Sequence, residues 1–350
     1  SGELKTKPSQ HSVNTLRSYG IQPEILVCRT AKPIPKVEKE KLALFCSVAK
    51  EAVIECRDMK SIYEVPLALE EQNFANVVLK LLQTPEREAN LDSWKALVDR
   101  INHPNKTVKI AIAGKFTKLS DAYISIVEAI KHAGYEQSAK AEIKWINSEE
   151  CTDSKQCAEL LKDVQGVIVP GGFGIKNIDG MINVITYARE NNIPFLGICL
   201  GMQCAVIEFA RNVLGFSDAH SVEMMGSTTH PVIDMMETQK NLTNMGGTMR
   251  LGSYECKLIK GSKIFEAYGE EFIKERHRHR YEFNSEYLSQ FEEAGMKATG
   301  INPNSNLVEV VEIPSHPYFV GVQYHPEYRS TVEEPSPLFV SFVKAASKMK

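Results

Sequence analysis

The chain has 350 residues, 24% of them charged and 43% hydrophobic, a composition typical of soluble globular proteins with about two domains. The formal net charge of −3 creates no field that would attract nucleic acid or an anionic membrane, and no run of about 18 apolar residues predicts a transmembrane helix. Residues 1–7 are polar and lack the apolar core of a secretory signal, so we expect a cytoplasmic protein.

The first 83 residues alternate between strand and helix patterns. Strands are predicted at 22–30 and 52–56, and helices at 36–48 and 65–83. This order is typical of a parallel sheet covered by helices, but two strands are too few for an independent domain. We therefore interpret residues 1–83 as the end of a larger domain, and residues 84–106, with a short helix around 92–101, as a linker.

A second α/β series begins at residue 107. Strands are predicted at 107–113, 141–146, 166–169 and 194–198, and helices at 120–134, 153–163, 178–191 and 200–213. The later part is rich in strand patterns, including 307–313 and 318–324. Residues 107–350 are therefore predicted to form one α/β domain around a mostly parallel central sheet.

The eight cysteines form no Cys-x-x-Cys pair, so we expect no metal site. A disulfide scaffold is not expected in a chain this long and rich in apolar residues, and most of these cysteines are interpreted as buried thiols. Cys199 is the exception. The pentapeptide 197–201, Gly-Ile-Cys-Leu-Gly, lies where an apolar strand turns into a helix, which is the pattern of a nucleophile elbow. The helix start favours a thiolate there, although a core cysteine between two glycines is the alternative.

Two further segments supply the partners that such a nucleophile needs. Residues 169–174, Val-Pro-Gly-Gly-Phe-Gly, follow a strand and can present a backbone N–H to an oxyanion. Residues 323–327, Gln-Tyr-His-Pro-Glu, place a base and a carboxylate two positions apart, on the same side of an extended segment. A nucleophile, a base and a residue that orients the base form a catalytic triad. Taken singly, these segments also suit an ordinary turn, a surface imidazole and a solvated carboxylate.

Together, and in this order, the three segments resemble the class I (triad-type) glutamine amidotransferases. In that family a strand ending in Pro-Gly-Gly is followed by Gly-x-Cys-x-Gly and, far downstream, by His-Pro-Glu. The resemblance implies that Cys199 attacks the side-chain amide of glutamine and that the N–H groups of Gly172 and Leu200 hold the oxyanion. It also implies that His325 protonates the departing ammonia and later activates water, while Glu327 orients His325.

Other segments resemble one family of these amidotransferases, the CTP synthases. They are Lys5–Val13, Gly114–Phe116 with Asp121–Tyr123, Gly246–Gly252 and Glu275–Glu282. The resemblance covers nearly the whole chain, with Ser9 standing where the family usually has Thr. It implies a class I glutamine amidotransferase domain over 107–350, preceded by the end of a Rossmann-like synthase (amidoligase) domain.

The same resemblance implies a set of residues that bind glutamine. They are Gly172, Leu200, Gly201, Met202, Gln203, Glu223 and Arg280. Glu223 suits the α-ammonium of free glutamine, and an Arg fork suits its α-carboxylate. The alternating Arg and His residues 276–280 are too few for a nucleic-acid patch in an acidic chain and offer no clustered metal ligands. We interpret them as an exposed strand with one useful Arg.

The resemblance also implies nucleotide contacts near the start of the chain. UTP, or CTP as feedback inhibitor, is expected at Lys5, Thr6, Lys7, Pro8, Ser9, Gln10 and Lys41, and ATP at Arg57, Asp58 and Met59. From the residues alone, residues 5–10 also suit a solvated basic turn. For the full-length enzyme the resemblance implies ATP with Mg²⁺, GTP as effector and a homotetramer. No nucleic acid or membrane partner is expected.

The implied activity is ATP-dependent amination of UTP to CTP with glutamine as the nitrogen donor. Phosphoryl transfer needs a phosphate loop and Mg²⁺ ligands, and no Gly-x-x-x-x-Gly-Lys-Ser/Thr is found here. We therefore expect this chain to carry the glutaminase half and part of the UTP/CTP site, without a cofactor of its own, and not to make CTP alone. Gly246–Gly252, next to a lone Arg250, is predicted to be a mobile lid or a hairpin turn. Another class I glutamine amidotransferase, or a non-catalytic assembly module, is left open as an alternative.

Overall fold

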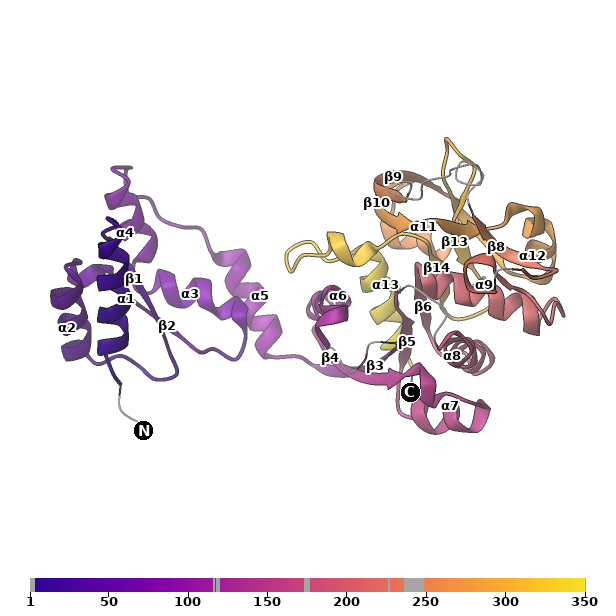
Figure 1. Cartoon of the computed structure of the whole chain (residues 1–350), viewed down its shortest axis with the longest axis horizontal. Coiled ribbons are helices and arrows are strands. Elements are labelled where there is room, and N and C mark those ends of the chain that lie inside the picture. Colours follow the sequence, from indigo (N-terminus) through magenta and orange to yellow (C-terminus); the bar gives the residue numbers. More distant parts are fainter. Residues whose placement is uncertain are drawn as a thin grey trace. The chain divides into compact units, whose positions relative to one another are not determined.

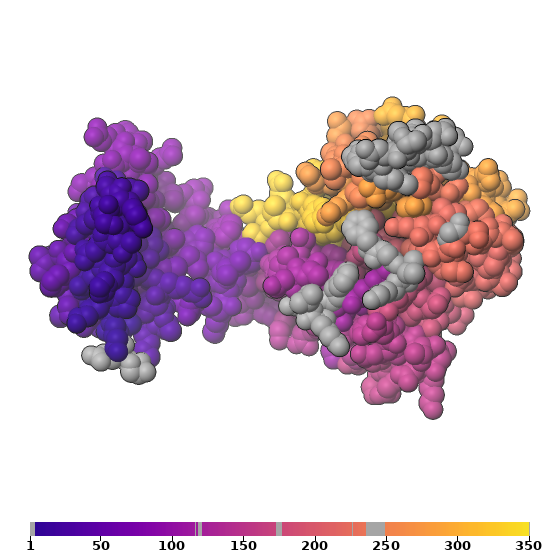
Figure 2. Space-filling view, viewed as in Figure 1, coloured from indigo at the N-terminus to yellow at the C-terminus, as the bar shows by residue number. Residues whose placement is uncertain are grey.

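The structure is a computed structural model that describes residues 4–115, 117, 120–172, 177–225, 227–235 and 249–349. It divides into two compact units, Ser1–Asn102 and His103–Lys350 (Figure 1). In the space-filling view the indigo part of the surface belongs to the first unit and the part from magenta to yellow belongs to the second (Figure 2). The division falls within the 84–106 segment predicted as a linker, and the helix expected there is α5, within the first unit.

The first unit is a small α/β structure around one parallel strand pair. Its elements are α1 (Lys7–Ser18), β1 (Leu26–Thr30), α2 (Lys36–Cys46), β2 (Val53–Arg57), α3 (Val65–Glu70), α4 (Phe74–Leu81) and α5 (Asp92–Asn102). β1 and β2 pair in parallel, and Val13, Leu42 and Val53 meet in a shared core. The single helix predicted over 65–83 is two helices, because Asn73 adopts a left-handed conformation (φ 58°) between them. Helix α1 replaces the predicted basic turn, and Pro8 suits its first turn because a proline there loses no helical hydrogen bond.

The second unit is built on a large twisted sheet. Its first half contains β3 (Lys106–Gly114), α6 (Ile124–Glu136), β4 (Ala139–Asn147), α7 (Ser154–Leu161), β5 (Gly166–Val169), α8 (Ile178–Glu190), β6 (Phe195–Ile198), α9 (Leu200–Asn212), β7 (His220–Ser221), α10 (Val222–Met225) and β8 (Pro231–Met235). Its second half contains β9 (Arg250–Leu258), α11 (Lys263–Tyr268), β10 (Phe272–His279), β11 (Tyr281–Phe283), α12 (Leu288–Ala294), β12 (Lys297–Ile301), β13 (Val308–Glu312), β14 (Phe319–Val322) and α13 (Pro337–Ala346).

Among the described residues, nine strands form the large sheet in the order β10-β9-β12-β13-β14-β6-β5-β3-β4. The run from β14 to β4 is parallel, and the strands from β13 to β10 extend it in antiparallel pairs. β7, β8 and β11 form a separate small sheet. The α/β fold with a central parallel sheet is therefore confirmed, with an antiparallel extension that the sequence pattern only indicated as β-rich.

Helices cover both faces of the sheet, and the strands alternate their side chains between two cores (Figure 1). On β3, Ile110 and Ile112 pack on the face covered by α6 and α13, whereas Ala111 and Ala113 pack on the face covered by α8 and α9. The three parallel strands β5, β6 and β14 are neighbours in the middle of the sheet. Their carboxyl ends meet at one edge, where α/β sheets commonly bind ligands.

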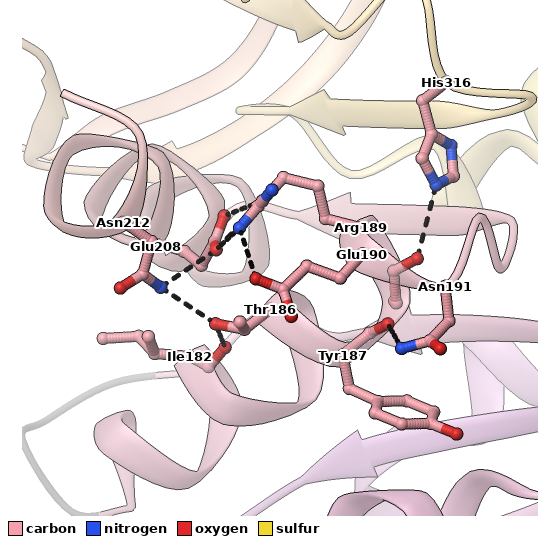
Figure 3. A network of polar contacts seen from close by, with 10 residues as sticks. Ile182, Thr186, Tyr187, Arg189, Glu190, Asn191, Glu208, Asn212 and His316 are labelled. Carbon is pink, nitrogen blue, oxygen red and sulfur yellow. Dashed lines mark hydrogen bonds and ion pairs between the residues drawn. The ribbon is translucent and has the colours of Figure 1, made fainter. Parts of the chain in front are cut away.

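A buried polar network ties α9 to α8 (Figure 3). Nε of Arg189 on α8 donates to both carboxylate oxygens of Glu208 on α9 at 3.0 Å, and Glu208 is fully buried. Nη2 of Arg189 and Nδ2 of Asn212 also donate to Oε1 of Glu208, at 2.9 and 3.0 Å. Charge-assisted hydrogen bonds from a planar guanidinium restrict geometry as well as contributing energy. The helix that begins beside Cys199 is thus held against its neighbour at a defined position.

Candidate active site

Cys199 lies in a strained turn between β6 and α9. Its backbone has φ 52° and ψ −101°, a conformation that non-glycine residues rarely adopt and that is typical of a nucleophile elbow. The Cys199 amide donates to the carbonyl of Val322 on β14 at 2.7 Å, which fixes the turn to the sheet. A Cβ atom at Gly201 would lie 2.0 Å from the carbonyl oxygen of Val169, so the turn requires glycine at this position. The predicted elbow is therefore present.

His325 and Glu327 follow β14 and reach Cys199 from the neighbouring strand. Nδ1 of His325 lies 2.8 Å from Oε1 of Glu327, and the His325 side chain also forms a hydrogen bond to Cys199. Burial alone would lower the pKa of His325, but its contacts with Cys199 and Glu327 outweigh this effect and raise the pKa to about 11. His325 thus lies between a carboxylate and a sulfur, the order of a nucleophile, a base and a residue that orients the base. All three members of the predicted triad are brought together.

Two clefts open beside the Cys199 sulfur. The first is lined by Gly172, Cys199, Leu200, Gln203, Glu223, Met249, Arg278, His279, Arg280 and Tyr281. The second lies on the His325 side and is lined by Ala122, Tyr123, Ser125, Ile126, Gly171, Gly172, Cys199, Arg278, His325, Glu327 and Tyr328. Gly171 packs so closely that a Cβ atom there would lie 2.9 Å from Cε1 of His325. The glycine turn after β5 thus leaves room for the imidazole.

The first cleft carries opposite charges on facing elements. Glu223 comes from α10, and Arg280 follows the end of β10. Burial raises the pKa of Glu223, whereas the nearby charges of Lys115 and Arg280 oppose this shift. A carboxylate and a guanidinium in one cleft complement the two ends of a free amino acid. Lys115 is a neighbour of Glu223 to which the sequence assigned no role.

The residues predicted to bind glutamine do not all line this cleft. Gly172, Leu200, Gln203, Glu223 and Arg280 do line it. Gly201 and Met202 do not, because both are buried in the packing of α9 under the sheet. The structure adds Met249, Arg278, His279 and Tyr281, which sequence reasoning missed. The sequence signal that could have indicated them is the alternation of side-chain type along residues 272–279, which is typical of a strand with one buried face.

The interpretation of residues 276–280 as an exposed strand is wrong for its histidines. Along β10 the residues alternate, with Arg276 and Arg278 exposed and His277 and His279 buried. His277 Nδ1 lies 3.0 Å from His279 Nε2, and His279 Nδ1 lies 3.1 Å from the Tyr281 carbonyl oxygen. His277 also lies 3.0 Å from the fully buried carboxylate of Glu309. A pleated strand with one face on the sheet core accounts for this alternation.

The prediction that Arg250 is a lone arginine in a mobile loop is also wrong. It begins β9, is buried, and pairs with Glu309 at 2.7 Å while its guanidinium lies over the Tyr254 ring at 4.4 Å. The part of the predicted lid from Arg250 to Gly252 is therefore strand. Residues 246–248 of that prediction lie outside the described residues, as do Phe116, Phe173 and Gly174 of the quoted motifs.

Two family models match the chain: the one described as "Glutamine amidotransferase class-I" over residues 118–345, and the one described as "CTP synthase N-terminus" over residues 1–84. The chain belongs to the class-I glutamine amidotransferase family. Within this family it is similar to CTP synthases. The CTP synthase of Caldanaerobacter subterraneus subsp. tengcongensis is 52% identical over 349 residues, 100% of this chain and 65% of the relative. The CTP synthase of Geobacillus kaustophilus is 52% identical over 347 residues, 99% of this chain and 65% of the relative. The chain thus spans just under two thirds of the length of these curated relatives.

A solved structure of the same family has a similar fold. The glutaminase domain of Trypanosoma brucei CTPS with bound acivicin is 37% identical, covers 69% of this chain and 95% of its own, and superposes with a TM-score of 0.66. The class I amidotransferase fold expected for residues 107–350 is thereby supported by a structure as well as by sequence. The sequence matches to CTP synthases extend over the first unit too.

The family's expected nucleotide contacts lie in the first unit. Lys5 and Lys7 are exposed at the start of α1, where Gln10 Nε2 donates to Thr6 Oγ1 at 3.1 Å, and Lys41 is exposed on α2, which packs against α1. Arg57 ends β2 and pairs with Glu55 at 2.9 Å. Asp58 pairs with Arg29 at 3.0 Å. Among the residues that the structure describes, no three His, Cys, Asp or Glu side chains are grouped so that they could hold a metal ion. In the part of the chain that the structure describes, we find no helix with the length and apolar character that a bilayer crossing requires.

Proposed function

We propose that this chain hydrolyses glutamine to glutamate and ammonia at Cys199. The observation that carries the proposal is the geometry of the triad, in which a strained elbow presents Cys199 to a buried His325 whose other nitrogen is held by Glu327 at 2.8 Å. The adjoining cleft carries Glu223 and Arg280, which would bind the α-ammonium and α-carboxylate of glutamine. Similarity to CTP synthases supports the same substrate.

The first half of the reaction forms a thioester. The Cys199 thiolate attacks the amide carbon of the substrate side chain, and the oxygen of that carbon becomes an oxyanion. The N–H of Leu200, in the first turn of α9, has no partner within its helix and would donate to this oxygen together with the N–H of Gly172. The His325 imidazolium gives its proton to the departing nitrogen, so that ammonia leaves and a γ-glutamyl thioester remains.

The second half returns the enzyme to its starting state. Neutral His325 takes a proton from water, the hydroxyl attacks the thioester carbon, and the thiolate is released with glutamate. The second cleft, which His325 and Glu327 line, would admit this water. Glu327 holds the imidazole and stabilises its cationic form in both halves.

For the whole enzyme we propose ATP-dependent amination of UTP to CTP, with ammonia from this site as the nitrogen source. Identity of 52% to CTP synthases along both units supports this assignment over another amidotransferase or a non-catalytic assembly module. Lys5, Lys7 and Lys41 would contact UTP or CTP as point charges, and Arg57, Asp58 and Met59 would contact ATP. GTP as effector, a homotetramer and a cytoplasmic location complete the proposal.

The test measures ammonia release from glutamine by the parent chain and by Cys199→Ala. We expect the variant to lose several orders of magnitude in rate while keeping the parent's circular dichroism and melting curve. Cys204→Ala is the matched control, because Cys204 is a fully buried thiol on α9, the helix that follows Cys199, and Cys204 lines neither cleft. Ammonia release by Cys199→Ala within tenfold of the parent would refute the assignment.

A further inference from the structure

We propose that Gln323 is a further catalytic residue, whose side-chain amide donates a hydrogen bond to the Cys199 sulfur. Nε2 of Gln323 lies 3.6 Å from Sγ of Cys199, and the Gln323 side chain is buried, with 1% of its surface exposed. The sulfur therefore has two donors, the Gln323 amide on one side and His325 on the other. The proposal rests on Cys199 being the nucleophile, as proposed above.

The orientation of the Gln323 amide follows from its neighbours. A glutamine amide can be turned over in a structure, so its donor end must be assigned from its partners. The carbonyl oxygen of Tyr281 only accepts, so the end of Gln203 that lies 3.0 Å from it must be Nε2. The same Nε2 lies 3.3 Å from Oε1 of Gln323. Because Oε1 of Gln323 faces a donor, its Nε2 must face the sulfur.

This chain of contacts is anchored at both ends. The Tyr281 carbonyl also contacts Nδ1 of His279 at 3.1 Å, and His279 in turn contacts His277, the neighbour of Glu309. At the other end, the backbone N–H of Gln323 donates to the carbonyl oxygen of Glu309 at 2.8 Å. The Gln323 amide is therefore held at the sulfur by groups from β10, β11 and β13. A donor that needs no reorganisation stabilises charge more effectively than water would.

A donor to sulfur favours the thiolate over the thiol, because the charged form is the stronger acceptor. In the resting enzyme Gln323 would share the negative charge of Cys199 with His325. When the sulfur attacks, its charge passes to the substrate oxygen, so the contribution of Gln323 is largest before the bond forms. Loss of this donor should therefore matter most at a pH where the thiolate is only partly populated, and least at high pH.

The test is the pH dependence of Cys199 alkylation by iodoacetamide, followed by mass spectrometry of the peptide that carries Cys199. Gln323→Leu and Gln323→Met remove the donor, and Gln323→Glu keeps an acceptor towards Gln203 while placing a carboxylate against the sulfur. We expect the pH of half-maximal alkylation to rise by about one unit in the Leu and Met variants and further in the Glu variant, with rates converging at high pH. At each pH below the midpoint, ammonia release should fall by the same factor as the alkylation rate.

Gln165→Leu is the matched control, because Gln165 is a partly buried amide of the same unit, bonded to Lys109 and Met349 far from the clefts. Its alkylation profile should equal the parent's. The parent itself supplies a second measurement. The side-chain NH₂ resonances of Gln323 in ¹⁵N-labelled protein should shift with the same midpoint as Cys199 alkylation.

The proposal would be overturned by an unchanged alkylation midpoint in a Gln323 variant that melts like the parent. It would also be overturned if the Gln323 side-chain resonances did not shift across the pH range in which Cys199 alkylation changes. These outcomes are independent of turnover. If the parent released no ammonia from glutamine but its alkylation midpoint still moved on Gln323 substitution, the proposed function would fail and the role of Gln323 at the sulfur would stand.

Discussion

Oε1 of Glu327 lies 2.8 Å from Nδ1 of His325, two positions earlier in the chain. An ionised carboxylate only accepts hydrogen bonds, so Nδ1 carries the proton and the other ring nitrogen is left for Cys199. The backbone N–H of His325 donates to the carbonyl oxygen of Arg276 at 2.8 Å, which ties this segment to β10. The tautomer and the position of the base are therefore both set by neighbours that do not react.

Glu327→Gln should reduce kcat for glutamine hydrolysis by about two to four orders of magnitude with little change in KM. The amide removes the negative charge that stabilises the imidazolium and can present a donor to Nδ1. Steady-state ammonia release checks this. Glu333→Gln, at an exposed carboxylate of the same segment, should behave as the parent does. A kcat for Glu327→Gln close to the control would contradict the orienting role.

Arg280→Ala and Glu223→Ala should each raise KM for glutamine by roughly ten- to a hundredfold, because each removes one charge-assisted contact to an end of the substrate. Their effect on kcat should be small by comparison. Arg276→Ala, an exposed arginine of the same run, is the control. If kcat collapsed while KM stayed constant, these two residues would act on the chemical step instead of on binding.

Arg189→Ala should lower the free energy of unfolding of the second unit by about 3–5 kcal/mol, because it leaves the buried Glu208 carboxylate without its guanidinium. Urea denaturation followed by Trp145 fluorescence in a Trp94→Phe background isolates this unit, since these are the two tryptophans of the chain. Lys140→Ala breaks an exposed pair with Glu142 and should cost less than about 1 kcal/mol. Equal costs for the two variants would show that the network in Figure 3 contributes little.

Glu275→Gln should stabilise the second unit at high pH. Burial raises the pKa of Glu275 to about 7, although the Tyr268 hydroxyl, at 2.8 Å, and Arg329 oppose the shift. A folded pKa above the unfolded value means that the parent loses stability as pH rises from about 4.5 through 7, by about 3 kcal/mol. A glutamine does not titrate, so the variant should gain on the parent over that window.

The measurement for Glu275→Gln is urea denaturation at pH 4.5, 6 and 8 with the same Trp145 signal. Glu255→Gln, at a more exposed carboxylate on β9, should show a pH dependence like the parent's. A constant difference between Glu275→Gln and the parent at all three pH values would mean that Glu275 does not titrate in this range.

The sequence predicted the triad because its signals are local. The Gly-x-Cys-x-Gly turn and the His-x-Glu spacing each depend on a few adjacent residues, and strands β5, β6 and β14 were predicted close to their observed bounds. Helix α1 was missed because Lys7 and Ser9 suit a turn equally well until Val13 packs against Leu42. Burial of His277 and His279 depends on Glu309, some thirty residues away in the chain, and no local pattern shows that pairing.

The alternation along β10 makes this strand sensitive to length as well as to composition. With Glu275, His277 and His279 inward and Arg276 and Arg278 outward, each position has a fixed side. Deleting or inserting one residue would turn every following side chain over, moving guanidinium groups into the core and imidazoles into water. Substitutions of the outward arginines are compatible with the fold, whereas a shift of the strand register by one residue is not. Insertions and deletions among homologues should therefore be absent from this strand and confined to the loops that flank it.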